Sequence, residues 1–136
     1  MLKLFLSSHG QMASGLKTSV NILFGNADQL TVYDAYVDET SLNDALDHFY
    51  EGVSDEDQVI MLSDLYGGSV NNTMFTYLTK PNRFLVAGVN LALVIELLTH
   101  QSITKEELDE IVTNARSMMT QLVNDDTPVS SDDDFF

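Results

Sequence analysis

The chain has 136 residues, of which 44% are hydrophobic, and contains no cysteine. This length suits one globular domain with a sizeable core, and the lack of cysteine excludes a disulfide framework or a thiolate metal site. Six basic residues against 21 acidic ones give a formal net charge of −15, which would repel nucleic-acid phosphates. We therefore expect no nucleic-acid binding, and an acidic surface that favours encounters with basic protein partners.

We find no secretory signal at the start of the chain and no membrane-spanning length in its longest apolar region. Residues 1–8 carry one basic residue and an apolar run that is too short for a secretory signal. Residues 84–98 include Asn90 and Glu96 and fall short of the ~20 apolar residues that a membrane span needs. We expect a cytoplasmic protein with no direct membrane insertion.

Strand-like and helix-like patterns alternate along the chain. Short apolar or β-branched runs predict four strands, at 2–6, 30–37, 59–62 and 84–89. Apolar residues spaced by three and four predict helices after each run, at 13–23, 41–49, 70–78 and 90–98. Such alternation predicts a mostly parallel sheet with helices on both faces, because each parallel crossover must leave the sheet and return right-handed.

The C-terminal quarter is predicted to hold one more helix and a tail. Thr104 opens a capping box, and the helix after it is expected to turn Met119 and Leu122 inward. Residues 125–136 contain five Asp and little apolar patterning. We therefore assign 1–124 to the domain and 125–136 to an acidic C-terminal tail or a loosely held edge strand.

Polar loops follow the first and the third predicted strands. In an open parallel sheet, ligands bind beyond the carboxyl ends of the strands, where the chain order reverses. If these two strands are neighbours, His9 and Asp64 lie together and the carboxylate accepts the Nδ1 proton of the imidazole. Nε2 is then a lone-pair nucleophile, which suits phosphoryl transfer because the carboxylate stabilises the cationic adduct.

The glycines of the second loop favour an anion. Gly67, Gly68 and Ser69 precede a predicted helix, so their backbone N–H groups would face a phosphoryl group. Such a transfer needs no metal and no other cofactor, because it depends mainly on alignment and charge stabilisation. Either loop alone is more often a turn or a helix cap, whereas their joint occurrence at two strand ends favours a functional site.

Three segments carry a family resemblance: 8–16 (Ser-His-Gly-Gln-Met-Ala-Ser-Gly-Leu), 64–69 (Asp-Leu-Tyr-Gly-Gly-Ser) and 87–90 (Ala-Gly-Val-Asn). In order and spacing, over about residues 1–122, the chain resembles the enzyme IIA component of the mannose-type (mannose/fructose/sorbose) phosphoenolpyruvate-dependent sugar phosphotransferase system. In that family, the histidine matching His9 receives a phosphoryl group from the histidine-containing phosphocarrier protein and passes it to enzyme IIB. The carboxylate matching Asp64 orients that histidine.

The resemblance also implies the fold, the assembly and the phosphoryl contacts. It implies a three-layer α/β sandwich around a mostly parallel four-stranded sheet in the order 2-1-3-4. It further implies a homodimer that exchanges a fifth, antiparallel edge strand, here residues 127–131. We assign two catalytic residues and four phosphoryl-binding residues, namely His9 and Asp64, and Gly10, Gly67, Gly68 and Ser69.

Other functions stay open on the sequence alone. The phosphocarrier subunit of a dihydroxyacetone kinase also has a His after its first strand, although Gly-Gly-Ser after Asp64 favours sugar transport. A non-catalytic regulatory binding module would dock a basic partner on the acidic surface and use His9 as a turn residue. A receiver domain is disfavoured because the first strand ends in Ser-Ser-His rather than in an acidic pair that would bind magnesium.

Overall fold

Four parallel strands form the central layer of the protein. The computed structural model describes residues 1–124. Its strands are β1 (Leu2–His9), β2 (Leu30–Ala35), β3 (Gln58–Ser63) and β4 (Arg83–Ala87). They pair in the order β2-β1-β3-β4, and all three neighbouring pairs are parallel, which confirms the predicted sheet.

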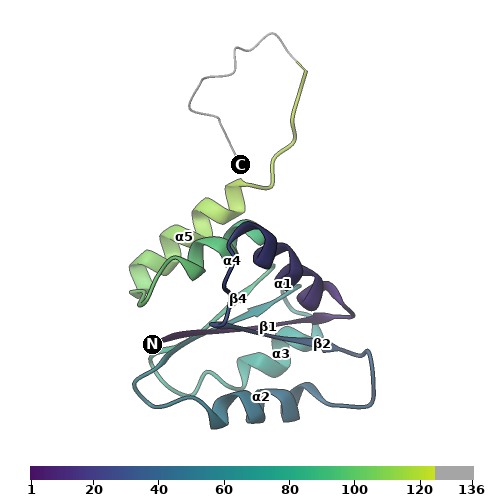
Figure 1. Cartoon of the computed structure of the whole chain (residues 1–136), viewed down its shortest axis with the longest axis vertical. Helices are drawn as coiled ribbons and strands as arrows, with labels where there is room; N and C mark the ends of the chain where they lie inside the picture. Colours follow the sequence, from purple (N-terminus) through teal and green to yellow (C-terminus); the bar gives the residue numbers. More distant parts are fainter. Residues whose placement is uncertain (125–136) are drawn as a thin grey trace.

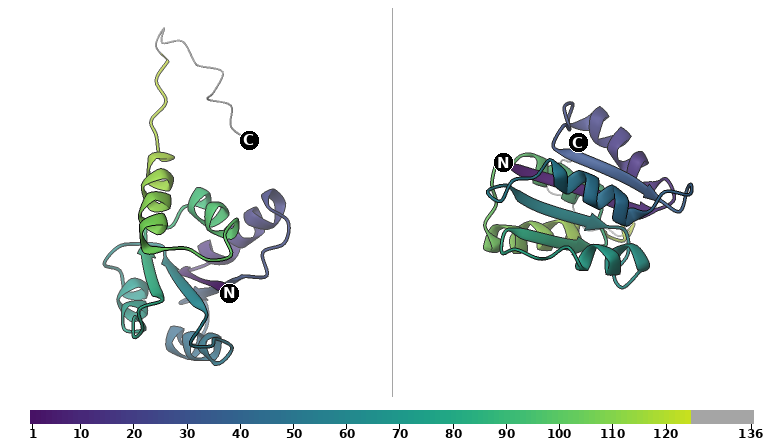
Figure 2. Two further views of the ribbon diagram at one scale, coloured as in Figure 1. Left: turned by 90° about the vertical axis from the view of Figure 1, so that its left-hand side faces the viewer. Right: turned by 90° about the horizontal axis from the view of Figure 1, so that it is seen from below.

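Helices cover both faces of this sheet, as Figures 1 and 2 show. One face is covered by α1 (Met12–Leu23), α4 (Leu91–Leu98) and α5 (Lys105–Ser117). The other face is covered by α2 (Leu42–Glu51) and α3 (Ser69–Phe75). The three-layer α/β sandwich expected from the alternating pattern is therefore confirmed.

The two cores explain why β1 is an almost continuous apolar run. Leu4 and Leu6 belong to the core under α1, α4 and α5, whereas Phe5 belongs to the core under α2 and α3. All three side chains are at most 1% exposed. Burial of each such side chain stabilises the fold by roughly 1.5–3 kcal/mol. A strand buried on both faces needs apolar residues at every position rather than at alternate positions.

Side-chain caps begin three of the helices where the sequence predicts them. Ser41 Oγ accepts a hydrogen bond from Asp44 N–H at 3.0 Å, and Asn90 Oδ1 accepts one from Leu93 N–H at 2.9 Å. Thr104 forms both halves of a capping box at the start of α5. These caps satisfy N–H groups that have no partner within the helix, so helix starts follow from local sequence.

Some predicted boundaries are wrong. The second strand ends at Ala35 rather than at residue 37, because Tyr36 adopts a positive φ of 66° that leaves the extended conformation. α5 ends at Ser117, so Met119 and Leu122 lie beyond it and are 86% and 92% exposed instead of facing inward. The predicted tail and its exchanged strand, residues 125–136, lie outside the described residues.

The topology places a ligand-binding edge between β1 and β3. After β1 the chain passes through α1 to β2 on one side, and after β3 it passes through α3 to β4 on the other side. The carboxyl ends of β1 and β3 therefore flank the point at which the strand order reverses.

None of the helices within residues 1–124 combines the length and apolar character that a bilayer span requires.

Candidate functional site

His9 and Asp64 meet at the carboxyl ends of β1 and β3. The strands pair in register up to Ser7 and Ser63, so His9 and Asp64, which follow within two residues, lie at the same edge of the sheet. Asp64 Oδ2 accepts two hydrogen bonds from His9, one from the backbone N–H and one from Nδ1, each 2.9 Å long. Because a carboxylate only accepts, Nδ1 carries the proton and Nε2 holds the lone pair on the far side of the ring.

The two members of this pair differ in exposure. The Asp64 side chain is 12% exposed, and the imidazole is 44% exposed. Burial raises the pKa of Asp64, but the hydrogen bonds from His9 and the imidazole charge outweigh it, so the pKa lies below its ordinary value of 3.8. Asp64 Oδ1 is buried without a hydrogen-bond partner among the described residues. A largely covered, ionised carboxylate therefore accepts a hydrogen bond at one edge of an accessible imidazole.

The start of α3 lies against the opposite edge of the imidazole. Ser69 Oγ is 3.3 Å from Nε2. A Cβ atom at Gly68 would lie 3.5 Å from His9 Cε1, so Gly68 faces the ring and leaves the width of a methyl group open beside it. Gly67 turns the chain at a φ of 76°, which only glycine adopts without strain. Of the predicted phosphoryl-binding residues, Ser69 lies beside Nε2 and Gly68 lies beside Cε1 of the ring.

Gly10 occupies a different position in the site. Its N–H group donates to the carbonyl oxygen of Ala35 at 2.8 Å, so this donor is already committed to the end of β2. Its φ of 64° turns the chain from β1 toward α1. Ser8 holds the same turn, since its Oγ accepts a hydrogen bond from Ala13 N–H at 2.7 Å. Gly10 thus shapes the loop that carries His9.

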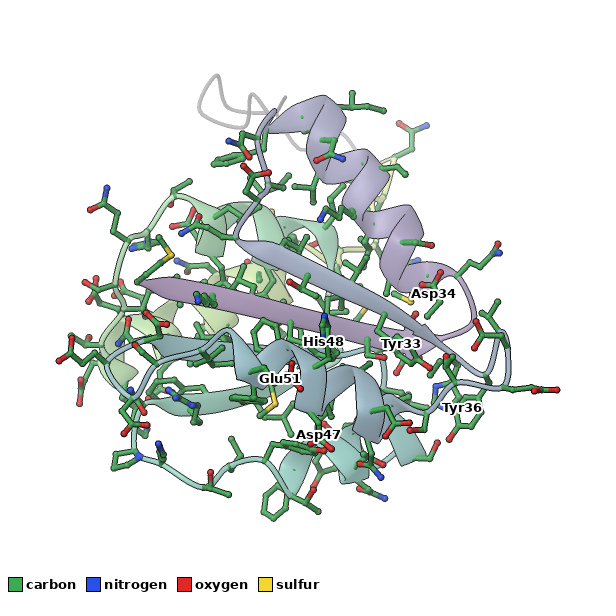
Figure 3. All side chains as sticks on the ribbon, turned by 60° about the horizontal axis from the view of Figure 1, so that its bottom comes forward. Tyr33, Asp34, Tyr36, Asp47, His48 and Glu51 are labelled. Atoms are coloured by element: carbon green, nitrogen blue, oxygen red, sulfur yellow. The ribbon has the colours of Figure 1, made fainter. Side chains whose placement is uncertain are left out.

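Tyr36, which no sequence motif indicates, lies just beyond the end of β2 (Figure 3). Its ring is stacked on the His9 imidazole, with centroids 5.3 Å apart and planes inclined by 27°. Its hydroxyl is 2.7 Å from Ser69 Oγ. The run 30–37 contains no glycine or proline that would end the strand before Tyr36, so the sequence gives no local signal for this position.

Exposed apolar side chains lie at the carboxyl edge of the sheet, on the loops that follow β2 and β3 and at the start of α1. We call this group the apolar rim: Met12, Tyr36, Val37, Leu65 and Tyr66. Each of its members is at least 45% exposed. Apolar side chains exposed together at one edge of a protein are typical of a surface that contacts another protein.

The chain has two further histidines, and each lies beside a single glutamate. His48 lies on the exposed side of α2, beside Glu51 (Figure 3). His100 follows α4 and lies 3.6 Å from Glu96. Within residues 1–124, no three His, Asp or Glu side chains gather as metal ligands.

The chain matches known proteins over most of its length. Residues 3–116 match the family model EIIA-man, described as PTS system fructose IIA component. A curated relative, the PTS system fructose-specific EIIA component of Bacillus subtilis (strain 168), is 25% identical over 124 residues, which cover 89% of this chain and 84% of the relative.

Solved structures give the same result. A putative phosphoenolpyruvate-dependent sugar phosphotransferase system permease from Klebsiella pneumoniae superposes with a TM-score of 0.80 and 30% identity, covering 88% of this chain and 90% of that one. The PTS IIA protein associated with the fucose utilization operon of Streptococcus pneumoniae gives 0.71 and 27%, covering 88% and 92%. The mannose/sorbose-specific IIA subunit of Enterococcus faecalis gives 0.69 and 26%, covering 93% and 98%.

These matches do not favour the dihydroxyacetone kinase subunit or the non-catalytic module. They confirm the family that the three sequence segments indicate. The chain belongs to the fructose/mannose-type IIA family of the sugar phosphotransferase system, and it is a phosphoryl carrier in sugar uptake.

Proposed function

We propose that this carrier holds its phosphoryl group on Nε2 of His9, with Asp64 orienting the imidazole. The observation that carries the proposal is the 2.9 Å hydrogen bond from Nδ1 to Asp64, which leaves the lone pair on Nε2. The exposure of the imidazole lets a second protein reach it. A neutral, oriented imidazole is a good nucleophile, and Asp64 stabilises the positive charge that forms on it.

The transfer needs no cofactor, because one bond to phosphorus forms as another breaks. The Nε2 lone pair attacks the phosphorus atom carried by the histidine-containing phosphocarrier protein. A new N–P bond forms, the donor's P–N bond breaks, and its electron pair returns to the donor's imidazole. Nδ1 keeps its proton throughout, so the phosphorylated ring is cationic beside the Asp64 carboxylate. The same steps then pass the phosphoryl group to a nucleophile of enzyme IIB.

The phosphoryl group would lie against the Gly67–Ser69 loop. The Ser69 hydroxyl is close enough to Nε2 to donate to a phosphoryl oxygen there. Gly68 lacks a side chain where it faces the ring, which leaves room for the group to approach. Gly10 would border the group, but its own N–H is occupied by Ala35 and would not bind it.

The phosphocarrier protein and enzyme IIB would dock on the apolar rim in turn. Both must bring a reactive atom to the same nitrogen, so their binding is mutually exclusive. The net charge of −15 favours partners with basic surfaces. We propose that these encounters take place in the cytoplasm.

The test is phosphorylation of the purified full chain. Incubation with phosphoenolpyruvate and the general phosphotransferase proteins should add one acid-labile phosphoryl group, detected by intact-mass spectrometry. His9→Ala should remain unmodified, whereas His48→Ala, which changes an exposed histidine on α2, should be modified like the wild type. An unchanged wild-type mass, or a phosphorylated His9→Ala protein, would refute the proposal.

We also propose a homodimer that uses the free side of β4. β4 is the last strand of the sheet in residues 1–124. A groove of about 680 Å³ runs beside it along α5, lined by Leu85, Val112 and Arg116 among others. Exposed Met119 and Leu122 lie just beyond α5. A C-terminal strand from a second copy, residues 127–131, would pair with β4 and cover these apolar side chains.

Light scattering tests the homodimer. The full chain should have twice the monomer mass, and a chain that ends at Asn124 should be monomeric. A monomeric full chain would refute the dimer, and a dimeric truncated chain would refute the exchanged strand.

A further inference from the structure

We propose that Tyr36 is a positioning residue for the transfer: its hydroxyl directs the Ser69 proton toward Nε2, and its ring holds one face of the imidazole. This inference rests on the proposed phosphorylation of His9. It assigns a role to a third strand end, since β1 supplies His9, β3 leads into Asp64, and β2 leads into Tyr36.

The contacts form one continuous chain around the imidazole. Tyr36 hydroxyl lies 2.7 Å from Ser69 Oγ, and Ser69 Oγ lies 3.3 Å from His9 Nε2. On the other edge of the ring, Nδ1 donates to Asp64 at 2.9 Å. Tyr36 therefore reaches His9 twice, through its hydroxyl by way of Ser69 and through its ring by stacking.

The proton on Nδ1 determines which atom donates in each of these hydrogen bonds. With Nδ1 as the donor, neutral Nε2 only accepts, so Ser69 must donate its single hydroxyl proton to it. Ser69 Oγ can then only accept from Tyr36, which donates. Without the Tyr36 hydroxyl, the Ser69 proton is free to turn away from the site. With it, the proton stays aimed at Nε2 and, after transfer, at a phosphoryl oxygen.

The backbone at Tyr36 is strained in a way that supports this role. Its φ of 66° belongs to the left-handed region, and Tyr36 is the only residue other than glycine with a positive φ within residues 1–124. This conformation costs an ordinary residue free energy and persists where surrounding contacts maintain it, often at functional sites. The side chain is nevertheless 69% exposed, so burial in the core does not explain it.

The ring has a second effect once His9 is phosphorylated. The phosphorylated imidazole is cationic while Nδ1 keeps its proton, and a cation within about 6 Å of an aromatic ring is stabilised by the ring's electrons. The ring also shields one face of the imidazole from water. The Tyr36 ring therefore lengthens the lifetime of the phosphohistidine, and the Tyr36 hydroxyl increases the rate of transfer.

The first experiment needs no phosphoryl group. Nitrogen-15 NMR of the full chain should show a shift of the His9 Nε2 signal in Tyr36→Phe, because Ser69 no longer donates steadily to that atom. Tyr33→Phe is the matched control: it removes a phenol hydroxyl on β2 that hydrogen-bonds Thr40 at 2.6 Å, whereas the Tyr36 hydroxyl bonds Ser69. An unshifted Tyr36→Phe signal, or an equal shift in Tyr33→Phe, would overturn the hydroxyl's role.

The second experiment separates the hydroxyl from the ring. At saturating donor, Tyr36→Phe should accept the phosphoryl group about fivefold more slowly, the effect of one hydrogen bond. After removal of all partners, its phosphohistidine should hydrolyse at the wild-type rate, while that of Tyr36→Ala should hydrolyse about two- to fivefold faster. Wild-type transfer in Tyr36→Phe, or wild-type hydrolysis in Tyr36→Ala, would refute the corresponding half of the proposal.

Failure of this inference is distinguishable from failure of the proposed function. If the wild-type chain is never phosphorylated on His9, the proposed function is wrong. The NMR comparison of Tyr36→Phe with Tyr33→Phe still tests the hydroxyl chain by itself. Tyr36→Gly, which fits the positive φ without strain, supplies a folded variant without a ring if Tyr36→Ala is unstable.

Discussion

Replacement of Asp64 by asparagine tests the central contact of the site. The substitution keeps the shape of the side chain and removes its charge. An amide oxygen in the place of Oδ2 can still accept both hydrogen bonds from His9, each 2.9 Å long. The change therefore isolates the carboxylate's charge from its geometry.

The structure sets the size of the expected effects. Hydrogen bonds to a charged group contribute about 1.5–3 kcal/mol, against about 0.5–1.5 kcal/mol for neutral ones, so two bonds to Asp64 lose roughly 1 kcal/mol each. The new amide nitrogen would occupy the buried position of Oδ1, which has no partner among residues 1–124. Burial of that unpaired group costs a further ~1–3 kcal/mol. The free energy of unfolding should thus fall by roughly 3–5 kcal/mol.

Transfer should suffer as well, because the cationic phosphorylated ring loses its counter-charge. A loss of about 1.4–2.8 kcal/mol there corresponds to transfer that is roughly 10- to 100-fold slower. The assay is rapid-quench measurement of phosphoryl transfer from the radiolabelled phosphocarrier protein, below the unfolding temperature of the variant. Urea denaturation of the same samples gives the free energy of unfolding.

Asp34→Asn is the matched control for Asp64→Asn. Asp34 is a partly buried carboxylate on β2 that accepts bonds from Ser14 N–H at 2.9 Å and Ser14 Oγ at 2.6 Å. This variant should lose stability but transfer at the wild-type rate. If Asp64→Asn transfers as fast as the wild type, or if Asp34→Asn slows transfer equally, the carboxylate's charge is not what orients and stabilises the imidazole.

Three further predictions concern the same loops. Because folding lowers the pKa of Asp64, ionised Asp64 stabilises the fold above about pH 3.8, and this stabilisation is lost as the pH falls through the pKa of Asp64 in the folded protein. Urea titrations below pH 3.8 should therefore show a smaller difference in the free energy of unfolding between wild type and Asp64→Asn. Ser69→Ala removes the hydroxyl next to Nε2 and should slow transfer about 5- to 10-fold without changing the circular dichroism spectrum. In Gly67→Ala the new Cβ atom would have no neighbour within 4 Å, but the residue would have to adopt a φ of 76°. This strain should lower the free energy of unfolding by about 1–2 kcal/mol. The control Gly15→Ala, inside α1, should raise it by about 0.5–1 kcal/mol.

Two of the interactions at the site could be predicted because they depend on strand order and strand ends. The reversal of strand order at β1 and β3 brings His9 beside Asp64, and each residue follows a visible apolar run after one or two serines. The start of α3 reaches Nε2 for the same reason, since Ser69 follows β3 by a short loop. The sequence does not show that a single oxygen, Oδ2, accepts both bonds from His9.

Sequence patterns predict the alternation of strands and helices, the caps at Ser41, Asn90 and Thr104, and a mostly parallel sheet. These features depend on residues that are close in the chain, or on apolar faces that must be covered. By contrast, only the folded chain shows that β2 stops before Tyr36 and that this ring stacks on His9. That outcome depends on contacts between side chains 27 and 33 positions apart, whose combined effect exceeds the local preference of an aromatic residue for a strand.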